Sequence, residues 1–321
     1  MQVTVLGAGV AGLCAATTFL EAGFDVTVQD RDADPRGASW LAGGMLAPGC
    51  EADGAPPDVI ARAAGSAEWW ETRVPGVERR GTIALAAPRD RAELSRFAAR
   101  TTGHETLTAA GIAALEPDLA GRFTTALYYK DEAHLCPRTA LAALTTRIRE
   151  MGGRFRLGCT ETPQGAVIDC RGIAARDRIS SLRAVRGEMA ILRSHDLAIS
   201  RTIRLLHPRF PLYIVARGNG IYMIGASMIE SSDPRPITAR TLMELLSAAY
   251  TLHPAFAEAS VIETGTGLRP AYADNRPRVT RAGDTLQING LYRHGFLLAP
   301  ALAAEALALF TETKASPCAL T

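Results

Sequence analysis

A glycine-rich motif between two short apolar segments constrains the fold of this chain most strongly. Residues 2–6 are apolar and predict a strand, and a complete GxGxxG motif follows at residues 7–12. Apolar residues then recur at helical spacing over 10–22, and residues 25–30 predict a second strand that ends in Asp30. A strand, a glycine-rich turn, a helix and a strand ending in an acidic residue are typical of a dinucleotide-binding unit.

Each glycine of the motif has a physical role in that unit. Gly7 makes the tight turn, Gly9 allows the backbone to approach a pyrophosphate, and Gly12 allows close packing of the helix on the strand. The phosphates would rest at the helix N-terminus, and Asp30 would accept hydrogen bonds from the ribose hydroxyls. A turn that binds no nucleotide is the alternative, which the flanking elements argue against. The motif does not distinguish NAD from FAD, because both contain the same adenosine diphosphate half.

Composition and charge narrow the class of protein. With 321 residues, 47% of them hydrophobic, the chain is long enough for one large domain or two interleaved domains. Its formal net charge of +2 and the lack of a basic stripe argue against a nucleic acid partner. The chain begins directly on a predicted strand, and no run approaches the roughly 18 apolar residues of a membrane span, so we expect a cytoplasmic protein.

The six cysteines show no metal-binding or disulfide pattern. No CxxC pair occurs, so neither a zinc site nor a disulfide framework is predicted, and we expect no metal. Most of the thiols should be buried apolar side chains. The cysteines are Cys14, Cys50, Cys136, Cys159, Cys170 and Cys318.

A second unusual stretch, residues 33–57, is rich in Gly, Ala and Pro but too apolar for a solvated linker. This composition indicates a segment folded against something large and flat. Gly43 and Gly44 would let the main chain approach a ring system, and Ser39 could contact phosphate. A buried structural loop is the alternative.

The order of elements predicts α/β organisation with an inserted antiparallel sheet. Four consecutive strands are expected between 184 and 226, with a hairpin turn at 218–220, and this texture differs from the alternating strands and helices around it. Helices are expected at 57–74, 89–101, 137–151, 237–252 and 300–310, and further strands at 81–87, 122–130, 154–157, 166–169, 261–268 and 285–288.

We therefore predict an FAD- or NAD-binding Rossmann-like domain interleaved with an antiparallel-sheet substrate domain. The nucleotide-binding domain comprises residues 1–77, 130–182 and 263–321, and the substrate-binding domain comprises 78–129 and 183–262. Ligands in such folds lie at the carboxyl ends of the parallel strands, where the second domain would cover them.

Several further motifs carry a resemblance to a known family. In order and spacing, the chain is similar to the FAD-dependent amine oxidases of the D-amino acid oxidase family, and within it to the glycine oxidases of thiamine biosynthesis. The resemblance covers nearly the whole length. Its specific pieces are Ala38 to Pro48, Glu132 to Arg138, Arg186 to Glu188, Tyr213 to Val215, Gly225 to Met228, Gly267 to Pro270 and Arg293 to Pro300.

The resemblance implies non-covalently bound FAD with its isoalloxazine between the two domains. Gly43, Gly44 and Met45 would line the flavin, and the start of the last helix would approach its pyrimidine end, where main-chain N–H groups favour the negative charge of reduced flavin. The candidate cofactor-binding residues are Gly7, Gly9, Val10, Ala11, Gly12, Asp30, Arg31, Ser39, Gly43, Gly44, Met45, Gly172, Arg293, His294, Gly295, Phe296 and Leu297.

The resemblance also implies four residues at the substrate. Arg269 matches the arginine that binds the substrate carboxylate, for which a guanidinium fork is well shaped, and Tyr213 matches a tyrosine that shares that carboxylate. Arg293 and Met228 match positions that line a small pocket. The alternatives are a surface ion pair for Arg269, a core aromatic for Tyr213 and simple core packing for Met228.

The chain departs from the family pattern at several positions. His294 replaces an asparagine, Leu291 replaces a histidine, Asn275 replaces a glycine, and Cys136 replaces a more polar residue. These differences concern substrate preference rather than flavin binding.

The resulting hypothesis is oxidation of a small amino acid, glycine first, to an imine, with oxygen reoxidising the flavin to release hydrogen peroxide. The imine would hydrolyse to glyoxylate or pass to a thiazole synthase, and the enzyme could form homo-oligomers. A D-amino acid or sarcosine oxidase of the same fold, an NAD-dependent dehydrogenase and a non-catalytic flavin-binding protein are the alternatives.

Overall fold

A six-stranded sheet carries the N-terminal motif in the computed structural model, which describes residues 1–208 and 210–315. The strand order is β16–β17–β9–β1–β2–β8. All neighbours are parallel except β16, which pairs antiparallel with β17 at one edge. The strands are β1 (Gln2–Leu6), β2 (Asp25–Asp30), β8 (Arg154–Leu157), β9 (Ala166–Asp169), β16 (Arg278–Ala282) and β17 (Thr285–Asn289).

The predictions for this sheet are largely confirmed. The four strands β1, β2, β8 and β9 have the predicted bounds, and β17 extends one residue beyond its predicted end. The edge strand β16 was not predicted, because its residues are polar or half-buried and show no apolar alternation.

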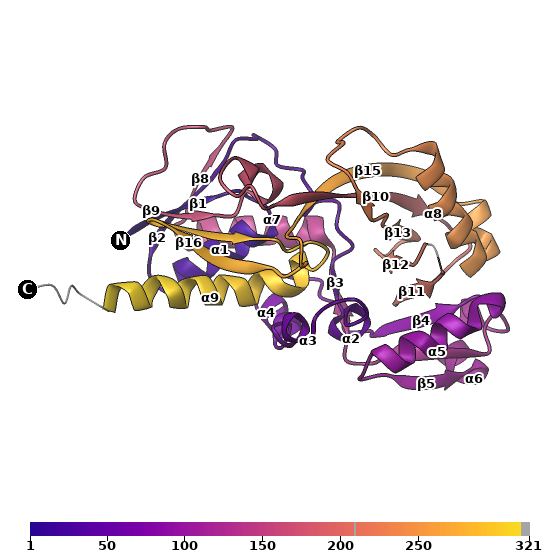
Figure 1. The fold of residues 1–321 in the computed structure, drawn as a ribbon. Helices are drawn as coiled ribbons and strands as arrows, with labels where there is room; N and C mark the ends of the chain where they lie inside the picture. Colours follow the sequence, from indigo (N-terminus) through magenta and orange to yellow (C-terminus); the bar gives the residue numbers. More distant parts are fainter. Residues whose placement is uncertain (209, 316–321) are drawn as a thin grey trace, which may run out of the picture.

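A nine-stranded sheet forms the other half of the molecule (Figure 1). Its order is β14–β10–β13–β12–β11–β4–β6–β5, and β15 pairs with β10. The strands are β4 (Thr82–Ala86), β5 (Glu105–Thr108), β6 (Thr125–Tyr129), β10 (Arg183–Arg193), β11 (Thr202–Leu206), β12 (Leu212–Ala216), β13 (Ile221–Gly225), β14 (Ile229–Glu230) and β15 (Ser260–Ala271).

This second sheet is antiparallel, as predicted, apart from one pair. Strands β4 and β11 are parallel neighbours, because they come from two separate segments of the chain that meet in the middle of the sheet. The hairpin between β12 and β13 turns at 218–220, where all three residues have positive φ. The long strands β10 and β15 run from one half of the molecule to the other (Figure 1).

Helices cover the six-stranded sheet and the outer face of the second one. Helix α1 (Val10–Glu21) packs against both α7 (Pro137–Glu150) and α9 (Gly295–Ala315), and α8 (Ala239–Leu252) packs on β10, β12 and β13. The remaining helices and the short strand pair are α2 (Pro48–Glu51), α3 (Pro57–Ala61), α4 (Ser66–Glu71), α5 (Arg91–Arg100), α6 (Ala109–Leu115), β3 (Met45–Leu46) and β7 (Ala133–His134).

The single helix predicted over 57–74 is wrong. Two short helices, α3 and α4, occupy this range, and Gly65 between them has a φ of 74°. A right-handed helix cannot pass through a left-handed residue, so the chain turns at Gly65.

The last helix begins five residues earlier than predicted, at Gly295, and contains Pro300. Proline lacks the N–H that would bond to the carbonyl of Phe296 one turn earlier. The indole N–H of Trp70, which is fully buried, donates to that carbonyl at 2.8 Å instead. A tertiary hydrogen bond thus replaces the missing helical one, which the local sequence could not reveal.

The expectation that no segment has the length and apolar character of a membrane span is wrong for residues Gly295–Glu312. Half of this window is buried inside the structure. Its apolar residues, including Phe296, Leu302 and Phe310, belong to the same hydrophobic core as α1 and the six-stranded sheet. The apolar character of α9 is therefore that of a core helix.

We predict that Trp70→Phe destabilises the protein by roughly 2–4 kcal/mol, because it leaves the buried Phe296 carbonyl unsatisfied and reduces packing. Urea unfolding monitored by circular dichroism measures the change. Trp69→Phe is the matched control, since Trp69 is only half-buried, and should cost less than half as much. Equal losses in the two variants would show that the indole–carbonyl bond contributes nothing.

Candidate functional site

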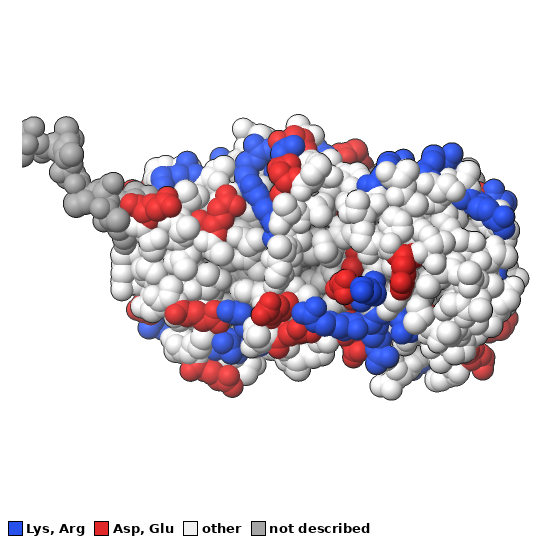
Figure 2. Space-filling model, turned by 90° about the horizontal axis from the view of Figure 1, so that it is seen from below, with Lys and Arg blue, Asp and Glu red and all other residues white. Residues whose placement is uncertain are grey.

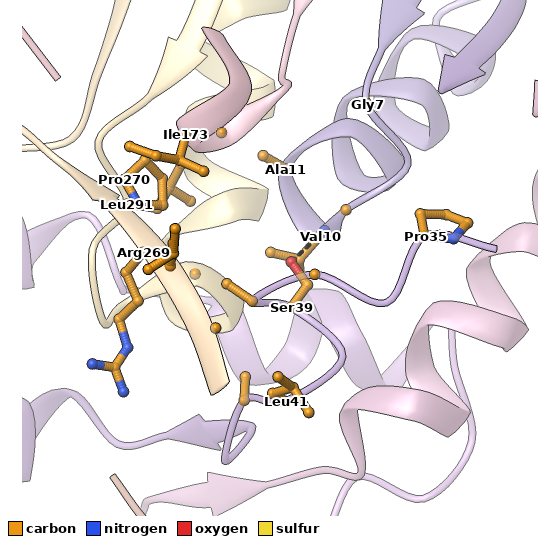
Figure 3. Close-up of a pocket in the computed structure, with 18 of the residues that line it drawn as sticks. Gly7, Val10, Ala11, Pro35, Ser39, Leu41, Ile173, Arg269, Pro270 and Leu291 are labelled. Carbon is orange, nitrogen blue, oxygen red and sulfur yellow. Dashed lines mark hydrogen bonds between the residues drawn. The ribbon is translucent and has the colours of Figure 1, made fainter. Parts of the chain in front are cut away.

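One cavity of about 790 Å³ joins the glycine motif to the second sheet. Every predicted site residue lines it except Gly12. Gly12 lies behind the wall, where a Cβ atom would clash with the carbonyl oxygen of Gly7. The structure therefore brings together segments that are up to about 290 residues apart in the sequence, as the side chains labelled in Figure 3 illustrate.

The glycine motif forms a cradle at one end of the cavity. Gly7 has a φ of +99°, and a Cβ atom there would clash with the backbone at Cys170. The carboxylate of Asp30 accepts hydrogen bonds from the N–H groups of Ala8 (2.8 Å) and Asp32 (3.0 Å). This fixes the carboxylate at the mouth of the cradle, beside Arg31, where it can still accept hydroxyl groups.

Ser39 meets the start of α1 in this cradle (Figure 3). Its Oγ accepts a hydrogen bond from the N–H of Val10 at 3.0 Å, so its own proton is free to donate to an anion. The helix N-terminus has no acidic residue in its first turn and carries partial positive charge. A pyrophosphate fits this cradle. The glycine backbone leaves room for it, and the hydroxyl proton of Ser39 and the N-terminus of α1 can interact with its negative charge.

Main chain from Gly43 to Met45 lines the middle of the cavity. Gly44 has a φ of +72°, and a side chain there would clash with the carbonyl of Leu135. The guanidinium of Arg217 donates to the carbonyls of Gly43 and Leu135, both at 2.7 Å. These two hydrogen bonds fix the position of the main chain at Gly43. Burial lowers the pKa of Arg217 to about 10. This role could not be predicted, because it depends on a contact between segments that are distant in the sequence.

The first turn of α9 closes the cavity from the other side. Gly295, Phe296 and Leu297 line it, and the last two side chains are buried in the core. Gly172, with a φ of +57°, lies nearby, and its carbonyl accepts a hydrogen bond from Asn289 at 2.9 Å. The positive end of a long helix thus faces the cavity, as a flavin that becomes negative on reduction requires.

Arg269, on β15, lines the cavity. Its Nη1 donates to the carbonyl of Ser227 at 2.9 Å, and its guanidinium packs against Gly187 of β10, where an added Cβ atom would lie 2.4 Å from it. Burial lowers the pKa of Arg269, and no carboxylate of the described residues forms an ion pair with it. The arginine is held in place with capacity left for an anionic ligand.

A buried carboxylate, Glu51, lies in the same part of the cavity wall and was not predicted. Its Oε2 lies 3.0 Å from Nε of Arg293 and 3.2 Å from Nδ1 of His294. Burial by itself would raise the pKa of Glu51, but Arg293, His294 and Arg204 together hold it well below its usual value. Glu51 is therefore ionised. No motif in the Gly/Ala/Pro-rich stretch around Glu51 indicated a site residue.

Tyr213 donates its hydroxyl proton to Glu51, with an O–O distance of 2.5 Å. A tyrosine has one hydroxyl proton. The hydrogen bond to Glu51 uses it, so Tyr213 cannot donate it to a substrate carboxylate as the resemblance implied. The oxygen retains acceptor capacity toward the cavity. Burial and the negative charge of Glu51 raise the pKa of Tyr213 well above its ordinary value, so the phenol stays neutral.

The other two predicted substrate residues differ in their surroundings. Arg293 is almost enclosed, and its Nη2 donates to the carbonyl of Asp53 at 2.7 Å in addition to the Glu51 pairing. Met228 is 46% exposed at the cavity rim, where its sulfur lies 3.5 Å from the hydroxyl of Tyr292. Met228 therefore lies at the cavity entrance, and the alternative that it is a core-packing residue is wrong.

No cluster of three metal-ligating side chains exists in the described part of the chain. Five of the cysteines are free thiols, of which Cys14, Cys50 and Cys170 are buried. Cys318 lies outside the described residues.

Comparison with known proteins shows the family. The model of the FAD dependent oxidoreductase family, DAO, matches residues 2–309. The chain belongs to this family. It is 54% identical over 318 residues to the thiamine biosynthesis oxidoreductase ThiO of Rhizobium etli, and the match covers 97% of both chains.

Two further comparisons place this oxidoreductase among more distant proteins. The bifunctional protein ThiO/ThiG of Nostoc sp. is 24% identical, over 98% of this chain and 53% of that protein. The crystal structure of glycine oxidase from Geobacillus kaustophilus superimposes with a TM-score of 0.81 at 23% identity, covering 99% of this chain and 96% of that one. The mixed two-sheet fold of the oxidoreductase is therefore that of its family.

The surface of the oxidoreductase shows charges of both signs. On the face in Figure 2, basic and acidic groups lie interspersed along the lower side of both halves. Such a face does not form the continuous basic stripe that nucleic acid binding requires.

A second buried carboxyl group of the oxidoreductase, Glu132, lies behind the cavity wall. Its Oε1 accepts the N–H of Cys50 at 2.8 Å, and its Oε2 has no partner among the described residues. Burial, reinforced by the charge of Glu51, raises the pKa of Glu132 to about 7.

We predict that Glu132 makes the folded enzyme less stable as pH rises. The folded state binds this proton more tightly than the unfolded state, so the stabilisation present below pH 4.5 is lost as pH rises through about 7. The loss amounts to at most about 3 kcal/mol. Glu132→Gln, which keeps an acceptor for Cys50, should flatten the pH dependence between 5 and 8 in urea unfolding. Parallel curves for the variant and the parent would exclude Glu132 as the source.

Proposed function

We propose that this FAD-dependent oxidoreductase oxidises glycine and other small amino acids, and supplies the thiazole branch of thiamine biosynthesis. The main support is the position of Arg269, a half-buried arginine that forms no ion pair with any carboxylate of the described residues and lines the cavity that also contains the dinucleotide cradle. An arginine held in this way binds a carboxylate at two points and orients it. The ThiO relative at 54% identity supports the pathway assignment.

FAD would bind non-covalently along the cavity. The pyrophosphate would lie against the Gly7–Gly12 motif and Ser39, the ribose against Asp30, and the ring system against Gly43, Gly44 and the first turn of α9. When bound, the flavin supplies the two-electron oxidant. Acid denaturation should leave the yellow flavin in solution after the protein has precipitated.

The protein residues would bind and orient the substrate. Arg269 would hold the carboxylate, and the oxygen of Tyr213 would accept an N–H of the amine, because Glu51 has taken the tyrosine proton. The ionised Glu51 would also favour a positively charged amine by its field. Two-point recognition of this kind fixes which Cα–H bond faces the oxidant.

Several partners follow from this proposal. The six-stranded part, residues 1–77, 130–182 and 263–321, would hold FAD, and residues 78–129 and 183–262 would bind the amino acid, with β15 crossing the boundary at 263.

Oxygen would be the electron acceptor. The fusion of ThiO with ThiG in Nostoc supports thiazole synthase as a recipient of the imine. Homo-oligomers remain a prediction that size-exclusion chromatography tests.

We predict that glycine bleaches the flavin absorbance of the purified protein in the absence of oxygen. Admitting oxygen should restore the colour and yield about one hydrogen peroxide per glycine consumed. Sarcosine and D-alanine serve as comparison substrates, and NAD should have no effect. Retained flavin that none of the three amino acids bleaches would reject the substrate assignment and favour a non-catalytic flavin protein. Preference for D-alanine or sarcosine would favour the corresponding oxidase.

We predict that Arg269→Ala raises the apparent KM for glycine roughly 100-fold while the bound FAD stays near one per chain, because a charge-assisted two-point contact is lost. Steady-state kinetics and the flavin-to-protein absorbance ratio measure the two effects. Arg193→Ala is the control, since Arg193 is an exposed arginine at the end of β10. If FAD is lost in proportion to activity, Arg269 has a structural role.

A further inference from the structure

Arg204, on β11, is a buried cation in the cavity wall that no sequence motif indicated. It is only 6% exposed, and it lines the cavity beside Glu51 and Tyr213. Its guanidinium lies over the ring of Tyr213, its cross-strand neighbour, at 4.4 Å from the ring centre. Within the described residues it forms no hydrogen bond and no ion pair, and its Nε is fully enclosed without a partner.

The lack of partners sets Arg204 apart from other buried arginines that the structure describes. Arg186, equally buried, pairs with Glu188 and Asp233. Arg217 donates to two backbone carbonyls, and Arg293 pairs with Glu51. Burying a guanidinium without hydrogen-bond acceptors is unfavourable, and a cation–π contact satisfies none of its N–H donors. The N–H donors of Arg204 are thus available to a ligand, whereas Arg186, Arg217 and Arg293 donate to or pair with protein groups.

The charges around Tyr213 do not balance without a ligand. Arg204, Arg269 and Arg293 carry three positive charges, and Glu51 carries the negative charge that faces them. Arg293 lies within ion-pair distance of Glu51, but Arg204 does not. A substrate carboxylate on Arg269 neutralises one of the two remaining cations. Arg204, which is itself only 6% exposed, is then left with an unmatched charge.

Glu132, the other nearby carboxyl group, does not supply the missing anion. It points to the N–H of Cys50 and forms no ion pair with Arg204. Cys50 also lies close to Arg204, but burial raises the pKa of its thiol well above the ordinary value, so the thiol is neutral. No protein group among the described residues therefore supplies the acceptor for Arg204.

We propose that Arg204 binds a second carboxylate, so that the cavity takes small amines that carry two carboxylate groups. This inference rests on the proposed function, in which Arg269 holds the first carboxylate. In such a ligand the amine would lie between the two carboxylates, facing the oxygen of Tyr213. Iminodiacetate, a glycine with a carboxymethyl group on its nitrogen, is the simplest amine of this class.

Ligand binding to the oxidised holoenzyme tests the proposal without turnover. Succinate and butyrate have the same chain length and differ by one carboxylate, and perturbation of the flavin absorbance reports their binding. We expect succinate to bind at least tenfold more tightly than butyrate. Arg204→Met, which keeps most of the side-chain volume, should abolish this difference while the affinity for butyrate stays within about twofold. Arg193→Met, with the exposed arginine of β10, should leave both affinities unchanged.

A conservative variant protects the test against misfolding. If Arg204→Met does not retain FAD, Arg204→Lys preserves a positive charge and should keep at least part of the preference for succinate. Equal binding of succinate and butyrate by the unaltered enzyme would overturn the proposal. Equal weakening of both ligands by Arg204→Met would assign Arg204 a purely structural role over Tyr213 and overturn it as well.

The two proposals fail separately. Glycine bleaching the flavin, with no preference for dicarboxylates, would reject the Arg204 inference and keep the glycine assignment. Bleaching by iminodiacetate at a tenfold lower concentration than by sarcosine, whose nitrogen carries a methyl group instead, would support Arg204 even if glycine were inactive.

Discussion

The buried carboxylate of Glu51 is the interaction on which the rest of the site depends. It joins three separate parts of the chain: α2, where it resides, β12 through Tyr213, and the segment before α9 through Arg293 and His294. An ionised carboxylate with few partners would cost several kcal/mol when buried. The cavity wall is therefore stable only when the N-terminal segment, the second sheet and the C-terminal helix are all in place.

This arrangement explains how one cavity can serve two kinds of ligand. At one end, backbone and a helix terminus form a surface that suits a dinucleotide, with glycine where side chains would intrude. At the other end, arginines projecting from β11 and β15 suit small anions. The paired strands β10 and β15 extend between the halves, so the spacing of the two ends is set by the rigid geometry of a sheet.

Much of the fold could be predicted because it is recorded in local patterns. The strands of the βαβ unit have alternating or continuous apolar residues between clear turn signals, and their bounds matched the prediction. The errors arose where a distant contact overrode the local pattern. Pro300 suggested a helix start, but Trp70 supplies the hydrogen bond that lets the helix begin at Gly295. The apolar length of α9 is explained by its packing on α1, α4 and the strands of the six-stranded sheet.

The nucleotide cradle, the family and the carboxylate-binding candidate could be predicted without a structure, since each depends on residue types at fixed spacing along the chain. Which groups share protons and charges became evident from the folded chain. Tyr213 donates to Glu51, Arg293 pairs with the same carboxylate, and Arg204 finds no hydrogen-bond or ion-pair partner in the described part of the chain. Hydrogen bonds and ion pairs act over a few ångströms, and the sequence does not say which residues from remote segments come within that range.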